Sequence, residues 1–256
     1  MKLILLLGLC SLVLTAKAGD KVVKIATLND YEPFCFSQKF AVEVIQPGKN
    51  SKNLKGYSWD IVRESYHHMG YTIELYILPW SRALDFVKTG KVELLFPTGK
   101  NNSRKKIFRY STEYINKANL LIYTLQEKAL NWNGIQSLKG MTIAVKKDYN
   151  YGDTFNESNY FKKINVKKIS QGFKVLLVNR VDGFAGYEKN WDYIIAKENI
   201  KGDFKKSPYF GYATEFVVGK KESSSVKQLL NIFDQGKRHI DKIGLTEKIR
   251  QQWFQK

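Results

Sequence analysis

The chain has 256 residues, of which 43% are hydrophobic and 14% aromatic, enough to bury the core of one large domain or of two smaller ones. A formal net charge of +18 can indicate a nucleic-acid or anionic-membrane partner. The lysines are scattered, however, and the densest group flanks a strand-like Ile-Asn-Val segment (Lys162, Lys163, Lys167 and Lys168). A solvated face explains this group better than a phosphate-binding track, so we expect no nucleic-acid partner.

The N-terminus has the pattern of a secretory leader. Lys2 precedes the apolar run Leu3–Leu14, and the A-x-A cleavage sequence Ala16-Lys17-Ala18 follows. The run is too short for a stable transmembrane helix. We therefore predict a cleaved signal peptide over residues 1–18, export across the membrane and a mature chain that begins at Gly19.

The cysteines and histidines are few. Cleavage removes Cys10 and leaves Cys35 alone, so we expect no internal disulfide, with Cys35 as a small buried hydrophobe. His67 and His68 are adjacent on an expected helix and point to different faces, and only His239 remains, which leaves a zinc ion without a ligand set. The glycines form no phosphate-binding motif. The sequence thus predicts no metal and no cofactor.

The first half of the mature chain alternates strands and helices. Its hydrophobic patterns predict strands at Val22–Leu28, Tyr71–Leu78 and Val92–Phe96, and helices at Tyr57–Met69 and Ser81–Lys88. Gly70 and Gly90 follow the two helices as stop signals. Residues 39–55 are polar and irregular, which indicates a loop or hairpin. This alternation favours an α/β fold with a mostly parallel sheet.

The second half continues the alternation. We expect strands at Ala118–Leu125, Met141–Val145, Val166–Ile169, Val181–Ala185 and Thr214–Gly219. Helices are predicted from Asp153, at Gly172–Val178, and with helical spacing over Ser223–Phe254. The chain has no fixed-period repeat and no low-complexity tract.

The segment Tyr76–Ser111 carries the strongest functional signal. It places Trp80 at the end of one expected strand and Arg104 in a polar loop beyond the next. In an open α/β sheet both would line the crevice at the carboxyl ends of the strands, where ligands bind. A stacking ring beside a guanidinium suggests capture of a small acid or zwitterion. These residue types favour a ligand-binding site over a catalytic site.

Several short motifs follow one another in a specific order. They are Tyr31-Glu32-Pro33-Phe34, Gly56-Tyr57-Ser58-Trp59-Asp60, Lys88-Thr89-Gly90-Lys91-Val92-Glu93, Ser103-Arg104, Leu138-Lys139-Gly140 and Asn179-Arg180-Val181-Asp182. By these motifs the chain resembles the periplasmic solute-binding proteins of family 3, the amino-acid-binding type, over nearly all of its mature length. The pieces around Pro79–Ala83 and Phe96-Pro97 are typical of a divergent branch.

The resemblance implies the type II periplasmic-binding-protein fold, in which two α/β lobes are joined by two hinge crossovers and close over a ligand. Each lobe would have a mixed, mostly parallel sheet flanked by helices. The hinges would lie near Lys117–Leu121 and Ala213–Phe216. Lobe 1 would then comprise residues 19–117 and 213–256, and lobe 2 residues 118–212.

The resemblance also implies roles for residues of lobe 1. Tyr31 and Trp80 fall where the family holds its ligand between aromatic rings, although both could instead be core residues. Arg104 matches the arginine that clamps the ligand carboxylate, a task that suits a planar, always charged guanidinium; the alternative is an exposed loop arginine. Residues 97–101 would supply backbone N–H groups and the Thr98 hydroxyl to that carboxylate. Arg82 would point into the cleft from its helix, or make a surface salt bridge.

In lobe 2, the segment Asp148-Tyr149-Asn150-Tyr151-Gly152 precedes an expected helix. The N-terminal N–H groups of this helix, with Asn150 and Tyr151, would bind an anion, or else these residues form an ordinary cap. Tyr187 stands where the family's amino-acid binders usually have an aspartate that pairs with the ligand's ammonium. Glu188 would replace that aspartate after a shift of register.

Asp30 and Glu32 are the corresponding candidates from lobe 1. If none of these acids serves, the ligand would be something other than a standard α-amino acid.

Two hypotheses follow. In the first, the protein is a monomeric solute-binding protein that captures an amino acid or related carboxylate and delivers it to an ABC permease or a membrane sensor. In the alternative, it is an enzyme on the same fold, such as a cyclohexadienyl (prephenate or arogenate) dehydratase, with Glu188, Asp30 or Glu32 as the general acid. No spacing singles out one of these acids, so we predict a binding protein and no enzyme.

Overall fold

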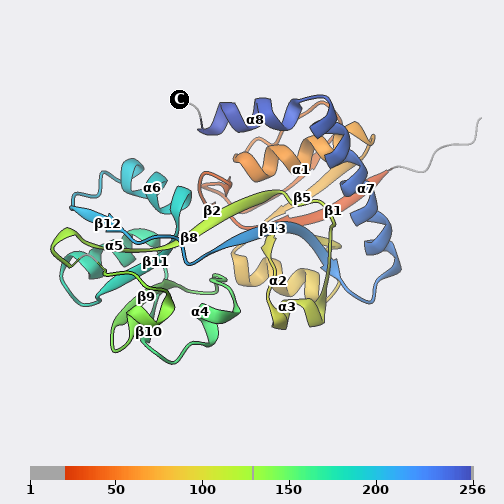
Figure 1. Ribbon diagram of the computed structural model, residues 1–256. Coiled ribbons are helices and arrows are strands. Elements are labelled where there is room, and N and C mark those ends of the chain that lie inside the picture. Colours follow the sequence, from red (N-terminus) through yellow and green to blue (C-terminus); the bar gives the residue numbers. More distant parts are fainter. Residues whose placement is uncertain (1–20, 129, 255–256) are drawn as a thin grey trace, which may run out of the picture.

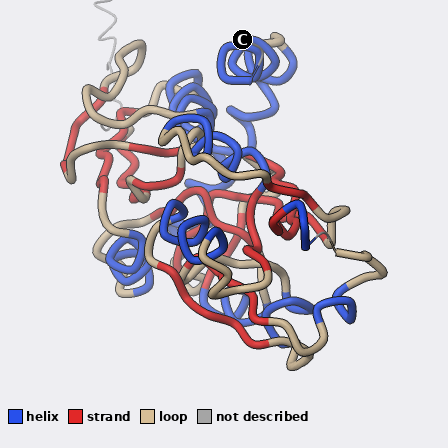
Figure 2. Tube along the Cα trace, turned by 90° about the vertical axis from the view of Figure 1, so that its left-hand side faces the viewer, coloured by secondary structure: helices blue, strands red, loops and turns tan. Residues whose placement is uncertain are grey.

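The computed structural model describes residues 21–128 and 130–254; the predicted signal peptide lies outside these residues. The chain forms two α/β lobes with two long strands running between them (Figure 1). In the view turned by 90°, helices flank the strands (Figure 2). None of the described helices is long and apolar enough to cross a membrane.

The first lobe is built from both ends of the described chain. Its strands are β1 (Val22–Thr27), β2 (Asp30–Tyr31), β3 (Cys35–Phe36), β4 (Ala41–Ile45), β5 (Thr72–Ile77), β6 (Leu94–Gly99) and β7 (Phe108–Tyr110). Its helices are α1 (Tyr57–His68), α2 (Trp80–Lys88), α3 (Asn102–Ile107), α7 (Ser224–Lys242) and α8 (Leu245–Phe254).

The second lobe takes the middle of the chain. Its strands are β9 (Thr142–Lys146), β10 (Lys162–Val166), β11 (Gly183–Tyr187) and β12 (Phe204–Lys206). Its helices are α4 (Asp153–Glu157), α5 (Ile169–Leu177) and α6 (Glu188–Lys197), with the short 3-10 turns η1 (Gln126–Lys128) and η2 (Ile135–Leu138). The long strands β8 (Asn116–Leu125) and β13 (Gly211–Lys220) run between the lobes.

One sheet runs through both lobes in the order β10-β9-β11-β8-β13-β6-β1-β5-β4. The pairs β1–β5, β1–β6, β9–β10 and β9–β11 are parallel, as the strand–helix alternation predicts. The two central strands pair antiparallel with each other and with their outer neighbours. Both predicted hinge segments therefore lie in adjacent strands at the middle of the sheet.

Local sequence explains most of these elements. In β5, Ile73, Leu75 and Ile77 are buried and alternate with partly exposed residues, the pattern of a half-buried strand. Helix α1 begins after Gly56, whose φ is 135° and whose missing Cβ would lie 2.1 Å from the Phe34 carbonyl oxygen. Only glycine fits this close approach.

Each lobe has its own aromatic anchor in the core. Trp59 of α1 and Trp191 of α6 are fully buried, and burial of a large apolar side chain contributes about 1.5–3 kcal/mol. Cys35 is buried, as the sequence predicts.

The structure corrects several predicted elements. Residues 39–55 contain β4, an edge strand, and the predicted strand Val166–Ile169 is replaced by the end of β10 and the start of α5. Edge strands such as β4 and β10 bury little of either face, so their hydrophobic pattern is weak. Helix α6 was not predicted. The C-terminal helical segment is two helices, because Gly244 adopts a φ of 74° after α7.

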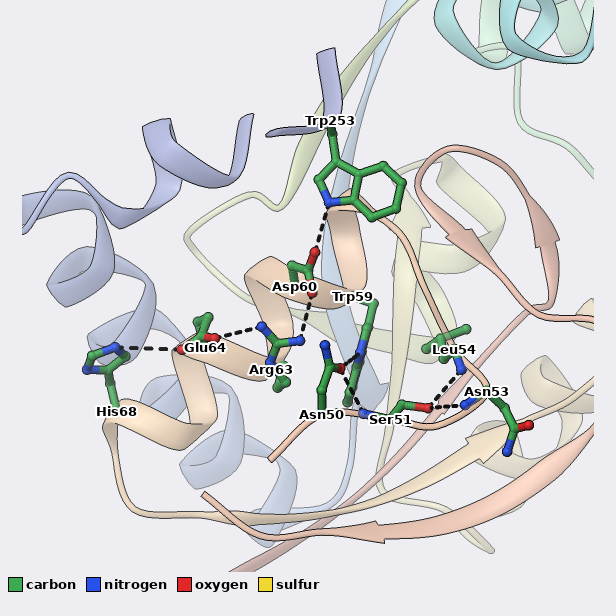
Figure 3. Close-up of polar contacts among 10 residues, drawn as sticks. All are labelled: Asn50, Ser51, Asn53, Leu54, Trp59, Asp60, Arg63, Glu64, His68 and Trp253. Atoms are coloured by element: carbon green, nitrogen blue, oxygen red, sulfur yellow. Dashed lines mark hydrogen bonds and ion pairs between the residues drawn. The ribbon is translucent and has the colours of Figure 1, made fainter. Parts of the chain in front are cut away.

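The C-terminal helix is fastened to α1 by a polar network (Figure 3). Trp253 Nε1–H donates to Asp60 (2.8 Å), which also pairs with Arg63 (2.7 Å). Arg63 in turn reaches Glu64 (2.7 Å), which lies 3.7 Å from His68. Of these contacts, the Trp253–Asp60 hydrogen bond joins α8 to α1 of the first lobe, and the others lie within α1.

Candidate ligand-binding site

A small cavity of about 30 Å³ lies where the two lobes meet. Its lining comes from three places: the first lobe, the second lobe and strand β13. The lining residues are Leu28, Tyr31, Trp80, Pro97, Gly99 and Arg104 from the first lobe, Asp148, Tyr149, Asn150 and Tyr187 from the second, and Glu215 from β13. This volume holds no more than about two water molecules, so the side chains of the two lobes almost fill the site.

Arg104 is held at the cavity by helix α3, not by the predicted loop. Asn101 caps this helix by accepting a hydrogen bond from the Arg104 backbone N–H (2.8 Å). Within the described chain, the guanidinium donates only to the carbonyls of Gly99 and Asp148, both at 3.3 Å. These distances are long for N–H···O bonds. The guanidinium therefore faces the cavity with two weak neutral partners.

Trp80 packs against the same guanidinium. The centre of its ring lies 5.4 Å from the Arg104 Cζ, within the range of a cation–π contact. Trp80 is the first residue of α2, directly after β5 and Pro79, so the strand–helix connection aims it at the crevice. The predicted pairing of ring and guanidinium is present in the structure.

Three tyrosines line the cavity side by side. The ring centres of Tyr31, Tyr149 and Tyr187 are 5.4–6.0 Å apart. Burial raises the pKa of each phenol well above its usual value, so all three are neutral at physiological pH. Tyr187 donates to the Asn150 carbonyl (2.6 Å), whereas the buried Tyr149 hydroxyl has no hydrogen-bond partner in the described part of the chain.

Glu215 is a buried acid on the central strand β13. Only 4% of its surface is exposed. In the described chain its two oxygens accept from the Tyr31 hydroxyl (2.8 Å) and from Asn116 Nδ2 (3.0 Å). Burial raises the pKa of this carboxyl to about 7, although both donors and the more distant Arg104 lower it in part. Glu215 therefore meets the cavity without an ion-pair partner among the described residues, and Arg104 is the cation whose charge acts on it from a greater distance.

The acids that the sequence proposed for ammonium recognition are paired elsewhere. Asp30 binds Lys146 (3.0 Å), and Glu32 binds Lys197 (2.6 Å). Glu188 accepts from Tyr209 (2.8 Å) and lies 3.4 Å from Lys206.

Five of the predicted site residues line the cavity: Tyr31, Trp80, Arg104, Asn150 and Tyr187. Four do not. Arg82 is exposed on α2, and the Thr98 hydroxyl is buried without a partner among the described residues. The Tyr151 hydroxyl accepts from the Lys146 N–H (2.9 Å), and Glu188 belongs to the Tyr209 and Lys206 contacts. Contact of any of these residues with a ligand stays a prediction.

Sequence reasoning missed Glu215 as a lining residue, whereas Asp148 and Tyr149 belong to the segment Asp148–Gly152 that it proposed as an anion site. Glu215 had one signal, because it is the only charged residue in the mostly apolar strand segment Ala213–Val218. A charge inside a buried strand usually has a partner or a function. Asp148 has a positive φ of 65°. The sequence before it, Lys146-Lys147, does not predict this backbone conformation.

The fold and the cavity between its lobes define a binding protein of the two-lobe periplasmic type. Residues 23–256 match the bacterial extracellular solute-binding proteins, family 3, and the chain belongs to this family. No curated protein matches the chain by sequence. The dehydratase alternative gains no support, because the family consists of solute-binding proteins.

Similar solved structures have the same fold. A mutant of ArgBP from T. maritima is 19% identical with a TM-score of 0.71, covering 92% of this chain and 96% of that one. A histidine kinase sensor domain similar to periplasmic binding proteins is 18% identical with a TM-score of 0.74, at 92% and 96% coverage. The L-arginine-bound amino acid ABC transporter substrate-binding protein AbpA from Streptococcus pneumoniae is 18% identical with a TM-score of 0.69, at 92% and 95% coverage.

Proposed function

We propose that this protein captures a small solute with a carboxylate group, an amino acid or a related acid, in the cavity between its lobes. Arg104 carries the proposal. Its guanidinium faces the cavity beside Trp80 and makes only two long bonds to carbonyl oxygens. A ligand carboxylate would replace these with two short, charge-assisted bonds in the fork geometry that guanidinium favours. The Trp80 ring would cover the apolar part of the ligand.

Capture would proceed by hinge motion. A cavity of about 30 Å³ is too small for an amino acid, so the ligand would bind an opened form, and the lobes would then close. Cross-lobe contacts define what opening must break: Asn150 Nδ2 donates to the Lys100 carbonyl (2.8 Å), and Lys146 pairs with Asp30 (3.0 Å). For the moving units we propose residues 19–117 with 213–256, and residues 118–212.

A membrane protein would bind the closed, ligand-loaded form. The name of one similar structure mentions an ABC transporter and that of another a histidine kinase sensor, which supports a permease and a sensor alike. We propose a monomer that works in the periplasm after removal of residues 1–18.

A thermal-shift screen tests this function. The purified protein, unfolded and refolded to remove bound solute, would be heated with amino acids, small carboxylates, polyamines and sugars. A ligand that binds only the folded state raises the melting temperature, and the shift grows with ligand concentration. We expect a shift with at least one carboxylate-bearing solute that is lost in Arg104→Ala. Shifts confined to sugars, or a shift that survives in Arg104→Ala, would contradict the proposal.

A further inference from the structure

Glu215 is a second charged group of the cavity, and it makes no ion pair with a described cation; the charge of Arg104, on the same cavity, acts on it only from a greater distance. Each carboxylate oxygen accepts one hydrogen bond from a neutral donor, Tyr31 or Asn116. A carboxylate offers about four acceptor positions, so about half of its capacity remains. A buried acid that is neither ion-paired nor fully hydrogen-bonded is costly to ionise. In a ligand-binding cavity, the group that removes this cost can come from the ligand.

Other acids near the cavity are less suitable. Asp30, Glu32 and Glu188 each lie within ion-pair distance of a lysine. Asp148 lines the cavity, but as a residue it is exposed to solvent, where water screens its charge. Glu215 is the buried carboxylate among the described lining residues.

The walls around Glu215 suit a cation. The rings of Tyr31, Tyr149 and Tyr187 enclose the same cavity, and aromatic faces attract positive charge. The Tyr149 hydroxyl is buried without a partner among the described residues and can accept a hydrogen bond from an N–H donor. At the other end, Arg104 repels a cation and attracts an anion.

We propose that Glu215 recognises the cationic nitrogen of the ligand, so that the ligand's ammonium lies against the central strand β13 while its carboxylate lies at Arg104. This inference rests on the proposed function and makes the ligand a zwitterion. Tyr187 then does not exclude an amino acid. With Tyr187 in place of the usual aspartate, the second lobe has no acid at this position, and Glu215 supplies the negative charge from the central strand instead.

The recognition would depend on pH. The titratable or charged groups facing Glu215 are Tyr31, Tyr149 and Tyr187, the Cys35 thiol and Arg104. The three phenols and the thiol are neutral because burial raises their pKa values, and an arginine keeps its charge. With the Glu215 pKa at about 7, an ammonium ligand must displace a proton below that pH. Its affinity should then fall about tenfold per pH unit below 7.

Paired ligands test the proposal. Wild type and Glu215→Gln would be titrated by calorimetry at pH 8 with each amino acid that stabilises the protein and with its des-amino counterpart, for example phenylalanine and 3-phenylpropionate. We expect wild type to prefer the amine at least tenfold. Glu215→Gln should lose at least thirtyfold in affinity for the amine, bind the des-amino acid within threefold of wild type, and show no pH dependence between 5 and 8. Glutamine keeps the shape; its amide oxygen can accept from Asn116 while the Tyr31 hydroxyl turns to accept from the amide NH2, so a loss of affinity reports the charge.

Controls separate this inference from the proposed function. Asp234→Asn removes another buried acid, one that caps the Thr112 and Glu113 N–H groups away from the cavity, and should leave the amine preference unchanged. If Glu215→Gln does not fold, Tyr31→Phe serves, because loss of its hydrogen bond should move the pH midpoint of amine binding upward. An amine preference that persists in Glu215→Gln, or a midpoint unmoved by Tyr31→Phe, would overturn the inference alone. Failure of wild type to bind any carboxylate would overturn the proposed function and with it this inference.

Discussion

Arg104 and Glu215 carry opposite charges at one cavity, yet the protein holds them in different ways. Arg104 lies half-buried on the short helix α3 and contacts carbonyls of both lobes. Glu215 is fully enclosed on the central strand β13 and is held by neutral donors. A half-exposed guanidinium keeps its charge at little cost, whereas an enclosed carboxylate keeps its charge only with a partner. Arg104 can therefore stay charged without a ligand, whereas the charged form of Glu215 is stabilised only when a cationic group of the ligand pairs with it.

The largest expected effect is at the arginine end. Arg104→Ala should weaken binding of a carboxylate ligand by about 2–4 kcal/mol, because a charged bidentate contact is lost and the ligand carboxylate is left unpaired. Calorimetry measures the change. Lys105→Ala, a cation on the same helix that does not line the cavity, is the matched control. Equal affinities for all three proteins would place the carboxylate elsewhere.

At the glutamate end, the comparison predicts a pH-dependent stability without ligand. The Glu215 pKa is raised from 4.5 to about 7 on folding, so the folded state binds the proton more tightly. The resulting stabilisation is fully present below about pH 4.5 and is lost as the pH rises through 7, by about 3 kcal/mol.

Urea unfolding of wild type and Glu215→Gln between pH 4.5 and 8 checks this. The difference between the two proteins should change by that amount over the interval. A difference that stays constant with pH would show that Glu215 titrates normally.

A third prediction concerns Trp80, which packs against the Arg104 guanidinium. Trp80→Ala should weaken binding by about 1–3 kcal/mol, because a buried aromatic anchor is lost. Trp132→Ala, at a tryptophan that packs on Phe210 in the second lobe (6.3 Å between ring centres), should leave the affinity within twofold. Similar losses in both variants, measured by calorimetry, would indicate general destabilisation rather than a ligand contact.

The smallest effect is expected away from both ends. Lys197→Ala removes the cross-lobe ion pair with Glu32. The Lys197 side chain is 51% exposed. An exposed pair of this kind contributes about 0–1 kcal/mol, so ligand affinity should change less than about fivefold. A larger loss of affinity in calorimetry would mean that exposed cross-lobe pairs such as Lys197–Glu32 hold the lobes closed more than the ligand contacts at Arg104 and Glu215 do.

Local sequence was sufficient for the arginine end. The segment from β5 to α3 is a strand, helix, strand and helix in direct succession, and hydrophobic periodicity predicts the first three of them. Their carboxyl ends must lie at one edge of a parallel sheet, so Trp80 and Arg104 could be placed together before any coordinates. The motifs around the same residues also carried the resemblance to family 3, and with it the two-lobe fold that the structure shows.

The glutamate end was decided by tertiary structure. Glu215 is far from Tyr31 and Asn116 in sequence, and it meets the cavity because β13 pairs with β6 on one side and with β8 on the other. The register sets Glu215 opposite Gly99 and Asn116. A shift of one residue would turn its side chain to the other face of the sheet. Periodicity within a segment determines which elements form, whereas the register between distant strands determines which charge reaches the ligand.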